Sequence, residues 1–329
     1  MKDVAEDAHV SVPLVSQILN GRDCRVTEEK RQEVIQSARR LGYHVPVKSA
    51  TGQSARSKIL GLIIPNLERD FFVSLVTQIS EATRSAGYEL CTFISGDDSV
   101  TERKHIDYCR SKQFAGLFVN PSDPRSNGEY YDWLTTLDLP VVFVDRSLFK
   151  AEIKCVSSDN FAAAYHMTEK LIEAGHEKIV FVLQGEVQFT SVLIERFDGY
   201  CEAMRAHNLT PAKETIYCAL DVSEQPIIDF DNYSAAVLCT STKIVQILSA
   251  MKQRRNSVNR LSVATFDPIR FSVSNSNESH VFEAMTSDIA IALQDSKKIA
   301  DAAVGLMLKS IDGDRSAERI MIPCAFEQY

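Results

Sequence analysis

The first 21 residues constrain the fold most, because their apolar positions outline two short helices joined by a tight turn. In the second of these, Val15, Ile18 and Leu19 have the three-and-four spacing of a helix with one buried face. Ser11 is a suitable N-cap for that helix, and Thr27 can cap a third helix. The pattern predicts a helix-turn-helix, whose second helix can enter a DNA major groove, although other small helical subdomains share this outline.

A weakly basic segment precedes an acidic body. Residues 1–58 hold ten Lys or Arg and seven Asp or Glu, a net charge of +3, so the remaining residues must carry −11 to give the chain its −8. A basic head on an acidic body suits a protein that reads DNA with its head while the duplex repels the body.

Short motifs in the first 43 residues occur in the order found in one known protein family. They are Asp3-Val4-Ala5, Val10-Ser11, Val15-Ser16, Asn20-Gly21, Val26-Thr27, Lys30-Arg31 and Leu41-Gly42-Tyr43. The segment resembles the DNA-binding headpiece of the LacI/GalR family of bacterial transcription regulators. This resemblance implies a helix-turn-helix headpiece over residues 1–44, a hinge linker over 45–57 and an effector-binding and dimerisation core over 58–329.

The core alternates short apolar runs with amphipathic helical stretches, which is the pattern of βαβ units in a parallel sheet. Strands are predicted at 59–65, 88–94, 116–119 and 141–144, and in a second series at 179–183, 235–239 and 261–266. Helices are predicted at 71–86, 101–111, 130–137, 160–174, 191–207, 243–252 and 299–311. The predicted fold class is α/β, with a small all-α headpiece and two doubly wound parallel-sheet lobes resembling type I periplasmic binding proteins. Such lobes place a ligand cleft at the carboxyl ends of their strands.

The resemblance also implies three crossings between the lobes, near residues 157, 288 and 320. Lobe one then comprises about 58–157 and 288–320, and lobe two about 158–287 and 321–329. The core lobes are expected to form the interface of a homodimer.

The DNA-binding residues follow from the same resemblance. The positions that read bases fall at Val12, Pro13 and Gln17, and those that contact phosphates fall at Ser11, Ser16, Asn20 and Arg31. Gln17 can bond bidentately to adenine, with a solvated surface amide as the plainer alternative. Gly52 stands where the family's hinge leucine wedges into the minor groove, and no leucine occurs from 45 to 57, so the sequence leaves open whether this hinge kinks DNA.

Effector contacts are implied at Asp145, Arg146, Arg196 and Asp267, with Phe71 and Phe72 against an apolar face of the ligand. Carboxylates accept from ligand hydroxyls, and an Arg side chain binds hydroxyls, carboxylate or phosphate. The ordinary alternatives are solvated strand-end caps for the charged residues and core packing for the two Phe. Arg196 is the strongest of these predictions, because a Gly and an aromatic residue follow it as in the family.

Two departures from the family pattern affect the expected effector. Thr240-Ser241-Thr242 replaces an Asn-Asp pair, and Pro268 replaces an Asp. Both changes remove groups that would hold sugar hydroxyls. The sequence therefore leaves the effector open as a sugar, a sugar phosphate, an atypical small molecule or none.

No enzyme or metal chemistry is predicted. The sequence has no nucleophile elbow, P-loop or G-x-G-x-x-G motif, and its eight cysteines are scattered without a C-x-x-C pair or a His cluster. We expect no catalytic residue, no metal, no cofactor and reduced thiols. The absence of a signal peptide or a long apolar run favours a cytoplasmic protein that does not bind membranes.

These observations predict a homodimeric, ligand-responsive repressor that binds a near-palindromic operator on double-stranded DNA. The alternative is a small-molecule or protein-partnered binding protein with a decayed headpiece, which the missing hinge leucine favours.

Overall fold

The structure is a computed structural model that describes residues 2–19, 26–41, 57–122, 134, 139–148, 153–183, 190–212, 232–241, 261–268 and 286–328. The chain divides into two compact units, Met1–Ser57 and Lys58–Tyr329. The predicted helix at 243–252, the predicted helix at 130–137 apart from Leu134, and the hinge up to Arg56 lie outside the described residues.

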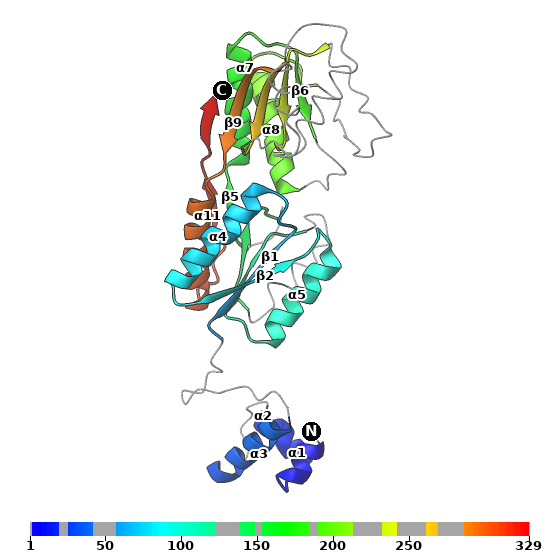
Figure 1. The fold of residues 1–329 in the computed structure, drawn as a ribbon, viewed down its shortest axis with the longest axis vertical. Coiled ribbons are helices and arrows are strands. Elements are labelled where there is room, and N and C mark those ends of the chain that lie inside the picture. The colour runs from blue at the N-terminus through cyan, green and yellow to red at the C-terminus, as the bar shows by residue number, and fades with distance from the viewer. Residues whose placement is uncertain are drawn as a thin grey trace, which may run out of the picture. The chain divides into compact units, whose positions relative to one another are not determined.

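Three helices form the first unit, and they are drawn in blue in Figure 1: α1 (Lys2–Asp7), α2 (Val12–Leu19) and α3 (Glu28–Arg40). Both predicted caps are present, because Ser11 Oγ accepts from the Leu14 N–H at 3.4 Å and Thr27 Oγ1 accepts from the Lys30 N–H at 3.3 Å. His9, in the turn between α1 and α2, has a left-handed φ of 50°. The apolar faces of the three helices meet in one small core, as the sequence pattern predicted.

Lobe one contains a six-stranded sheet in the order β10-β5-β4-β3-β1-β2, in which every pairing is parallel. Its strands are β1 (Ile59–Ile64), β2 (Glu89–Ile94), β3 (Gly116–Val119), β4 (Val141–Val144), β5 (Lys154–Ser158) and β10 (Arg319–Ile322). Helices α4 (Asp70–Ser85) and α11 (Ser296–Ile311) lie side by side on one face, and α5 (Ser99–Ser111) covers the other (Figure 1).

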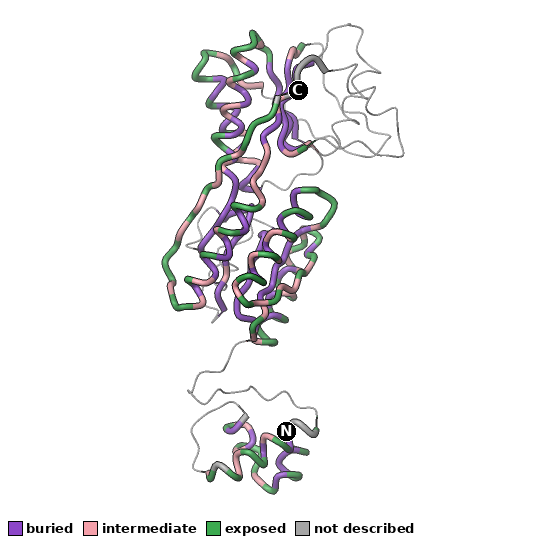
Figure 2. The backbone as a smooth tube through the Cα atoms, turned by 60° about the vertical axis from the view of Figure 1, so that its left-hand side comes forward, coloured by how far each residue is buried: buried purple, intermediate pink, exposed green. Residues whose placement is uncertain are grey.

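Burial of the lobe-one sheet on both faces explains its continuous apolar runs. Leu62 packs toward α4 and α11, whereas its neighbour Ile63 packs toward α5, and both are fully buried. Figure 2 shows the same arrangement, with buried strands at the centre and helices whose outer faces are exposed.

Lobe two contains a five-stranded sheet in the order β11-β9-β8-β7-β6. Its strands are β6 (Ile179–Val182), β7 (Ala235–Leu238), β8 (Leu261–Phe266), β9 (Thr286–Leu293) and β11 (Ala325–Gln328), and β11 pairs antiparallel with β9. Helices α7 (Asn160–Glu173) and α8 (Ser191–Ala206) pack against each other and against this sheet. The predicted α/β fold with two lobes is therefore confirmed, with one antiparallel edge strand added.

Three crossings connect the lobes, and the second lies later in the chain than predicted. The first follows Ser158, close to the predicted residue 157. The second follows Leu293 rather than residue 288, because β9 continues the sheet of lobe two. The third follows Ile322, close to the predicted residue 320, after β10 has paired with β5 along its whole length. Lobe one therefore includes residues up to 322, and lobe two includes the strand that ends at 293.

Candidate functional site

Polar side chains from both lobes gather where the parallel strands end and the chain crosses between the lobes. We call this group the interlobe cluster, and it consists of Asn120, Asp145, Asn160, Arg196, Asp267 and Gln294. The carboxylates of Asp145 and Asp267 both act electrostatically on the guanidinium of Arg196. The predicted residues Asp145, Arg196 and Asp267 are thus brought together, as expected for the carboxyl ends of parallel strands.

Asp145 directly follows β4 and has a left-handed φ of 67°. It is buried, and its Oδ2 accepts a hydrogen bond of 2.9 Å from Asn120 Nδ2 at the end of β3. The Oδ1 of Asn120 is buried and has no hydrogen-bond partner among the described residues. An unpaired buried acceptor is energetically costly, so a hydroxyl or amide donor of a bound molecule would stabilise this side chain.

Asp267 directly follows β8 with a φ of 65°. Gln294 Nε2 donates to both of its carboxylate oxygens, at 2.9 and 2.8 Å, and Gln294 Oε1 accepts from Ser158 Oγ at 2.9 Å. Burial raises the pKa of Asp267, although the charge of Arg196 and the Gln294 bonds oppose that rise. Sequence reasoning missed Gln294, which follows a strand that lacked a recognisable pattern.

Arg196 lies on α8 and is 4% exposed. Its Nε donates to Asn160 Oδ1 at 2.8 Å, its Nη1 donates to the carbonyl oxygen of Cys239, and its guanidinium carbon lies 3.5 Å from the centroid of the Phe266 ring. Burial lowers the pKa of Arg196, and the carboxylates of Asp267 and Asp145 oppose this effect. Because two of its nitrogens are bonded within lobe two, the guanidinium is held in one orientation.

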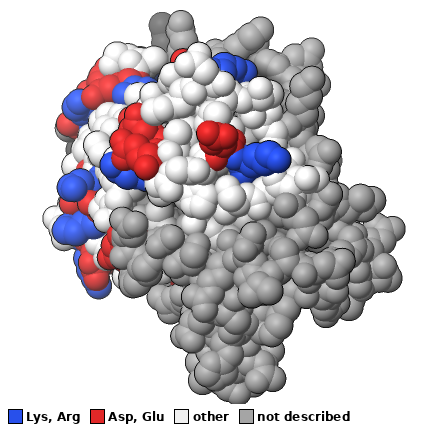
Figure 3. All heavy atoms as spheres, turned by 90° about the horizontal axis from the view of Figure 1, so that it is seen from above, with Lys and Arg blue, Asp and Glu red and all other residues white. Residues whose placement is uncertain are grey.

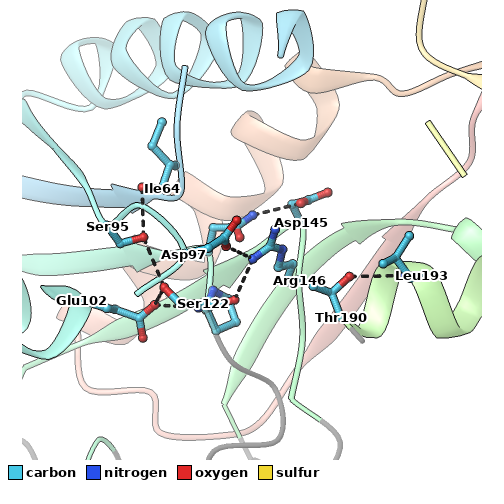
Figure 4. A network of polar contacts seen from close by, with 11 residues as sticks. Ile64, Ser95, Asp97, Glu102, Ser122, Asp145, Arg146, Thr190 and Leu193 are labelled. Atoms are coloured by element: carbon cyan, nitrogen blue, oxygen red, sulfur yellow. Dashed lines mark hydrogen bonds and ion pairs between the residues drawn. The ribbon is translucent and has the colours of Figure 1, made fainter. Parts of the chain in front are cut away.

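The guanidinium of Arg146 binds an acidic side chain and a backbone carbonyl of lobe one. Figure 4 shows this side chain turned toward Asp97, with which Nη1 forms an ion pair, and toward the carbonyl oxygen of Pro121 at 3.3 Å. The arrangement holds the turn after β2 against the end of β4. Arg146 is buried and is therefore no solvated strand-end cap, and its contact with an effector stays a prediction.

A buried carboxylate, that of Glu102, fixes the chain beyond β3, and Figure 4 shows it turned toward Ser122. Glu102 of α5 accepts from both the N–H and the Oγ of Ser122, each at 2.7 Å. Ser122 Oγ lies 3.2 Å from Ser95 Oγ, which donates to the Ile64 carbonyl. No motif indicates this network, because its members come from separate loops and a helix.

Phe71 and Phe72 lie in the first turn of α4, within the hydrophobic core of lobe one. They are 8% and 1% exposed, and their ring centroids are 5.6 Å apart. This burial favours core packing, the alternative weighed for both residues, and ligand contact by either ring stays a prediction.

The residues that depart from the family pattern, in the Thr240-Ser241-Thr242 segment and at Pro268, contact each other. Ser241 Oγ donates to the carbonyl oxygen of Pro268 at 3.1 Å, and the Ser241 N–H donates to the Phe266 carbonyl at 3.0 Å. Thr240, just after β7, is buried. The ends of β7 and β8 are therefore held together by small hydroxyl and backbone groups rather than by carboxylates.

Five of the expected DNA-binding residues lie on α2 and at its start, and Arg31 lies on α3. Val12, Pro13 and Gln17 are exposed, whereas Val15 and Ile18 are buried in the headpiece core, so α2 has one outward face. The predicted phosphate contacts are exposed at Ser11 and partly exposed at Ser16 and Arg31. Asn20 and Gly52 lie outside the described residues.

Charges on the body are mixed in sign. Ion pairs such as Lys170–Glu173 and Arg205–Glu202 place opposite charges side by side on α7 and α8. On the face seen in Figure 3, acidic and basic groups of the described residues likewise lie next to one another. The described part of that face therefore has no basic stripe of the kind that binds a nucleic acid.

The described residues contain no group of His, Cys, Asp and Glu arranged to hold a metal ion. Among the same residues, no helix is long and apolar enough to cross a membrane. The described cysteines are all free thiols, and burial raises the pKa of Cys109 and of Cys155 to about 12, so these two thiols are unreactive.

Two family models match the chain in the order of its units. The bacterial regulatory proteins of the lacI family match residues 1–45, and the periplasmic binding proteins and sugar binding domain of the LacI family match residues 57–223, more than half of the chain. The chain belongs to the LacI family. A periplasmic-binding-protein-like domain also matches residues 168–326 of this LacI-family chain.

Named relatives of this LacI-family chain are transcriptional regulators. The HTH-type transcriptional repressor PurR of Histophilus somni is 28% identical over 210 residues, which cover 64% of this chain and 62% of that protein. The chain thus matches less than two thirds of that relative's length. The sucrose operon repressor of Lactococcus lactis subsp. lactis is 25% identical over 322 residues, which cover 95% of this chain and 94% of that protein.

A solved relative shares the fold. The Cra transcriptional dual regulator from Pseudomonas putida, in complex with fructose 1-phosphate, superposes with a TM-score of 0.65 at 21% identity, covering 83% of this chain and 99% of that chain. At this identity the likeness supports the fold of the LacI-family body.

Proposed function

We propose that this LacI-family chain is an effector-responsive transcriptional repressor that binds a near-palindromic operator as a homodimer. One observation carries the proposal: the headpiece folds with Val12, Pro13 and Gln17 exposed on α2, whose other face is buried. A dimer would place one α2 in the major groove of each half-site. Such a regulator acts in the cytoplasm, where its operator is, and performs no chemical reaction.

We assign base reading to Val12, Pro13 and Gln17. Gln17 supplies the bidentate donor and acceptor that recognise adenine, whereas Val12 and Pro13 supply apolar contact to a thymine methyl group. Phosphate contacts at Ser11, Ser16, Asn20 and Arg31 would fix the position of α2 without reading sequence.

We place the effector against Asp145, Arg196 and Asp267. The guanidinium of Arg196 would supply N–H donors, and Asn120 Oδ1 is an acceptor without a partner among the described residues. Two carboxylates beside one guanidinium suit a ligand rich in hydroxyl groups better than a multiply charged anion. Because these groups come from both lobes, a bound effector would change the angle between the lobes and alter operator affinity, a coupling of about 1–3 kcal/mol.

The test is selection of the purified full-length protein against random duplexes at near-physiological salt, followed by sequencing of the bound pool. Non-specific binding fades at that salt concentration, so enrichment reports specific contacts. Enrichment of a two-fold-symmetric site supports the proposal. The matched control is Val15→Asp, which disrupts the headpiece core and should enrich nothing.

A failure to enrich, in protein shown to be folded and dimeric, would favour the second candidate, a binding protein whose headpiece no longer reads DNA. Gly52 is the residue that favours it, since glycine cannot unstack a base step. The selection is then repeated in the presence of a panel of sugars and sugar phosphates. Enrichment that appears only with one of these compounds would show that the protein needs a corepressor, whereas no enrichment with any of them would support the second candidate.

A further inference from the structure

Asn160 connects the guanidinium of Arg196 to the first crossing between the lobes. It is the first residue of α7 and is 1% exposed. Its Oδ1 accepts from Arg196 Nε at 2.8 Å, and its Nδ2 donates to the carbonyl oxygen of Ser158 at 3.1 Å. One buried amide therefore bonds at the same time to the candidate effector contact and to the backbone that leaves lobe one.

The residue before Arg196 reaches the other lobe. Successive residues of a helix point in different directions, so Glu195 and Arg196 diverge although they are neighbours on α8. Glu195 Oε1 forms an ion pair with Arg319 Nη2 of β10, the edge strand of lobe one. Its other carboxylate oxygen lies 3.5 Å from Asn160 Nδ2, at the long end of hydrogen-bond distance.

These contacts form a continuous path from lobe one to the interlobe cluster. The path runs from Arg319 to Glu195, then through the side chain of Asn160 to Arg196. Arg319 is fixed to lobe one by the pairing of β10 with β5, whereas Glu195 belongs to lobe two. A rotation of one lobe against the other must therefore separate Arg319 from Glu195 or displace this turn of α8.

We propose that Asn160 is a positioning residue for Arg196, and that through it the Arg319–Glu195 ion pair makes the placement of the guanidinium depend on the arrangement of the lobes. The proposal rests on the proposed function, because it describes how the effector contact is regulated. While Arg319 and Glu195 remain paired, Asn160 holds the guanidinium of Arg196 in the cluster. When the lobes rotate and Arg319 separates from Glu195, the contact between Glu195 and Asn160 is lost as well. The guanidinium of Arg196 then becomes more mobile.

The test follows the Nε–H of Arg196 by NMR in full-length, deuterated protein with ¹⁵N-labelled arginine, where Arg196→Lys identifies the signal. Arg319→Gln should speed hydrogen exchange at this Nε–H by about two- to fivefold, the range that a partly exposed ion pair supports. Lys309→Gln is the matched control, because it removes another partly exposed ion pair of lobe one, with Glu318 next to β10, and should leave the exchange rate unchanged.

A second variant separates positioning from general stability. Asn160→Asp keeps an acceptor for Arg196 but removes the donors toward Ser158 and Glu195, so the Nε–H should stay protected and Arg319→Gln should no longer affect it. An unchanged rate in Arg319→Gln, or the same rate increase in the Asn160→Asp background, would overturn the proposal. If Asn160→Asp does not fold, the comparison of Arg319→Gln with Lys309→Gln decides alone. The measurement uses neither operator nor effector, so it succeeds or fails independently of the duplex selection.

Discussion

Asp145 and Asp267 occupy equivalent places in the two lobes. Each follows a parallel strand in the interior of its sheet, and their φ angles are 67° and 65°. Each donates its backbone N–H to the adjacent strand, Asp145 to the Val156 carbonyl at 2.8 Å and Asp267 to the Ala292 carbonyl at 2.9 Å. Left-handed backbone is uncommon outside glycine and is concentrated at functional sites. The two lobes therefore present a carboxylate in the same way, one from each side of the crossings.

Replacing Arg196 should remove the response to effector. We expect Arg196→Ala to abolish the effector-induced change in operator affinity while the body stays folded, at a cost of about 1–3 kcal/mol for the polar groups left without a partner. Fluorescence anisotropy with the selected duplex, with and without the active compound, measures the response. Arg205→Ala, on the same helix with a side chain 65% exposed, should respond like the parent protein. An intact response in Arg196→Ala would remove this residue from the site.

Stability should depend on pH through Asp267. Because burial raises its pKa in the folded state, the folded protein holds the proton more tightly than the unfolded chain. The parent protein should therefore gain stability relative to Asp267→Asn as pH falls through the raised pKa toward the ordinary value of 3.8. Urea unfolding midpoints of both proteins across this range test the sign, and a difference independent of pH would contradict it.

Asp314 should show the opposite dependence. Backbone and side-chain hydrogen bonds from Ser316 are the main cause that lowers the pKa of Asp314 to about 2. Its stabilising contribution is present above the ordinary value of 3.8 and is lost as pH falls from there toward 2. The parent protein should therefore be more stable to unfolding than Asp314→Asn above pH 3.8, and this difference should disappear as pH falls toward 2. The same urea unfolding midpoints measure it.

Two glycines in helices should respond to alanine with opposite signs. A Cβ at Gly199 of α8 would stand 2.3 Å from the Phe161 carbonyl oxygen of α7, so Gly199→Ala must separate the two helices and should cost at least about 1–3 kcal/mol. A Cβ at Gly305 of α11 meets nothing within 4 Å, so Gly305→Ala should stabilise by about 0.5–1 kcal/mol. Thermal unfolding of both variants tests the pair, and similar melting temperatures would refute the packing argument.

The sequence predicted the buried parallel strands well, because runs such as 59–64 are continuously apolar. It failed on β5, whose residues Lys154–Ser158 are all buried although three of the five are polar or charged. It also failed on β10, an edge strand in which half-buried and exposed residues alternate. Gln294 was missed for a related reason, because it has no motif of its own and its role arises only when separate crossings are brought together. The Ser158-Asp159-Asn160 segment resembles part of the family's effector-binding core, but that resemblance alone gives Asn160 no role.

Gln17 should determine operator sequence rather than overall affinity. We expect Gln17→Ala to weaken discrimination at one base pair of each half-site by about 1–3 kcal/mol and to relax the selected sequence there. Gln36→Ala is the control, since Gln36 is an exposed residue of α3 outside the predicted contact set. A uniform loss of affinity across all sequences in Gln17→Ala would place this side chain on the phosphate backbone instead.

The three crossings also govern how this protein is made. Lobe one lacks α11 and its edge strand β10 until residues beyond 295 are synthesised, and lobe two lacks β9 and β11 until the chain has passed 286 and 325. Neither lobe is a continuous stretch that a ribosome can release and let fold first, in contrast to the headpiece. Until those residues have emerged, lobe one lacks the apolar face of α11 and lobe two lacks two strands of its sheet, so chaperones should bind the nascent chain during that interval.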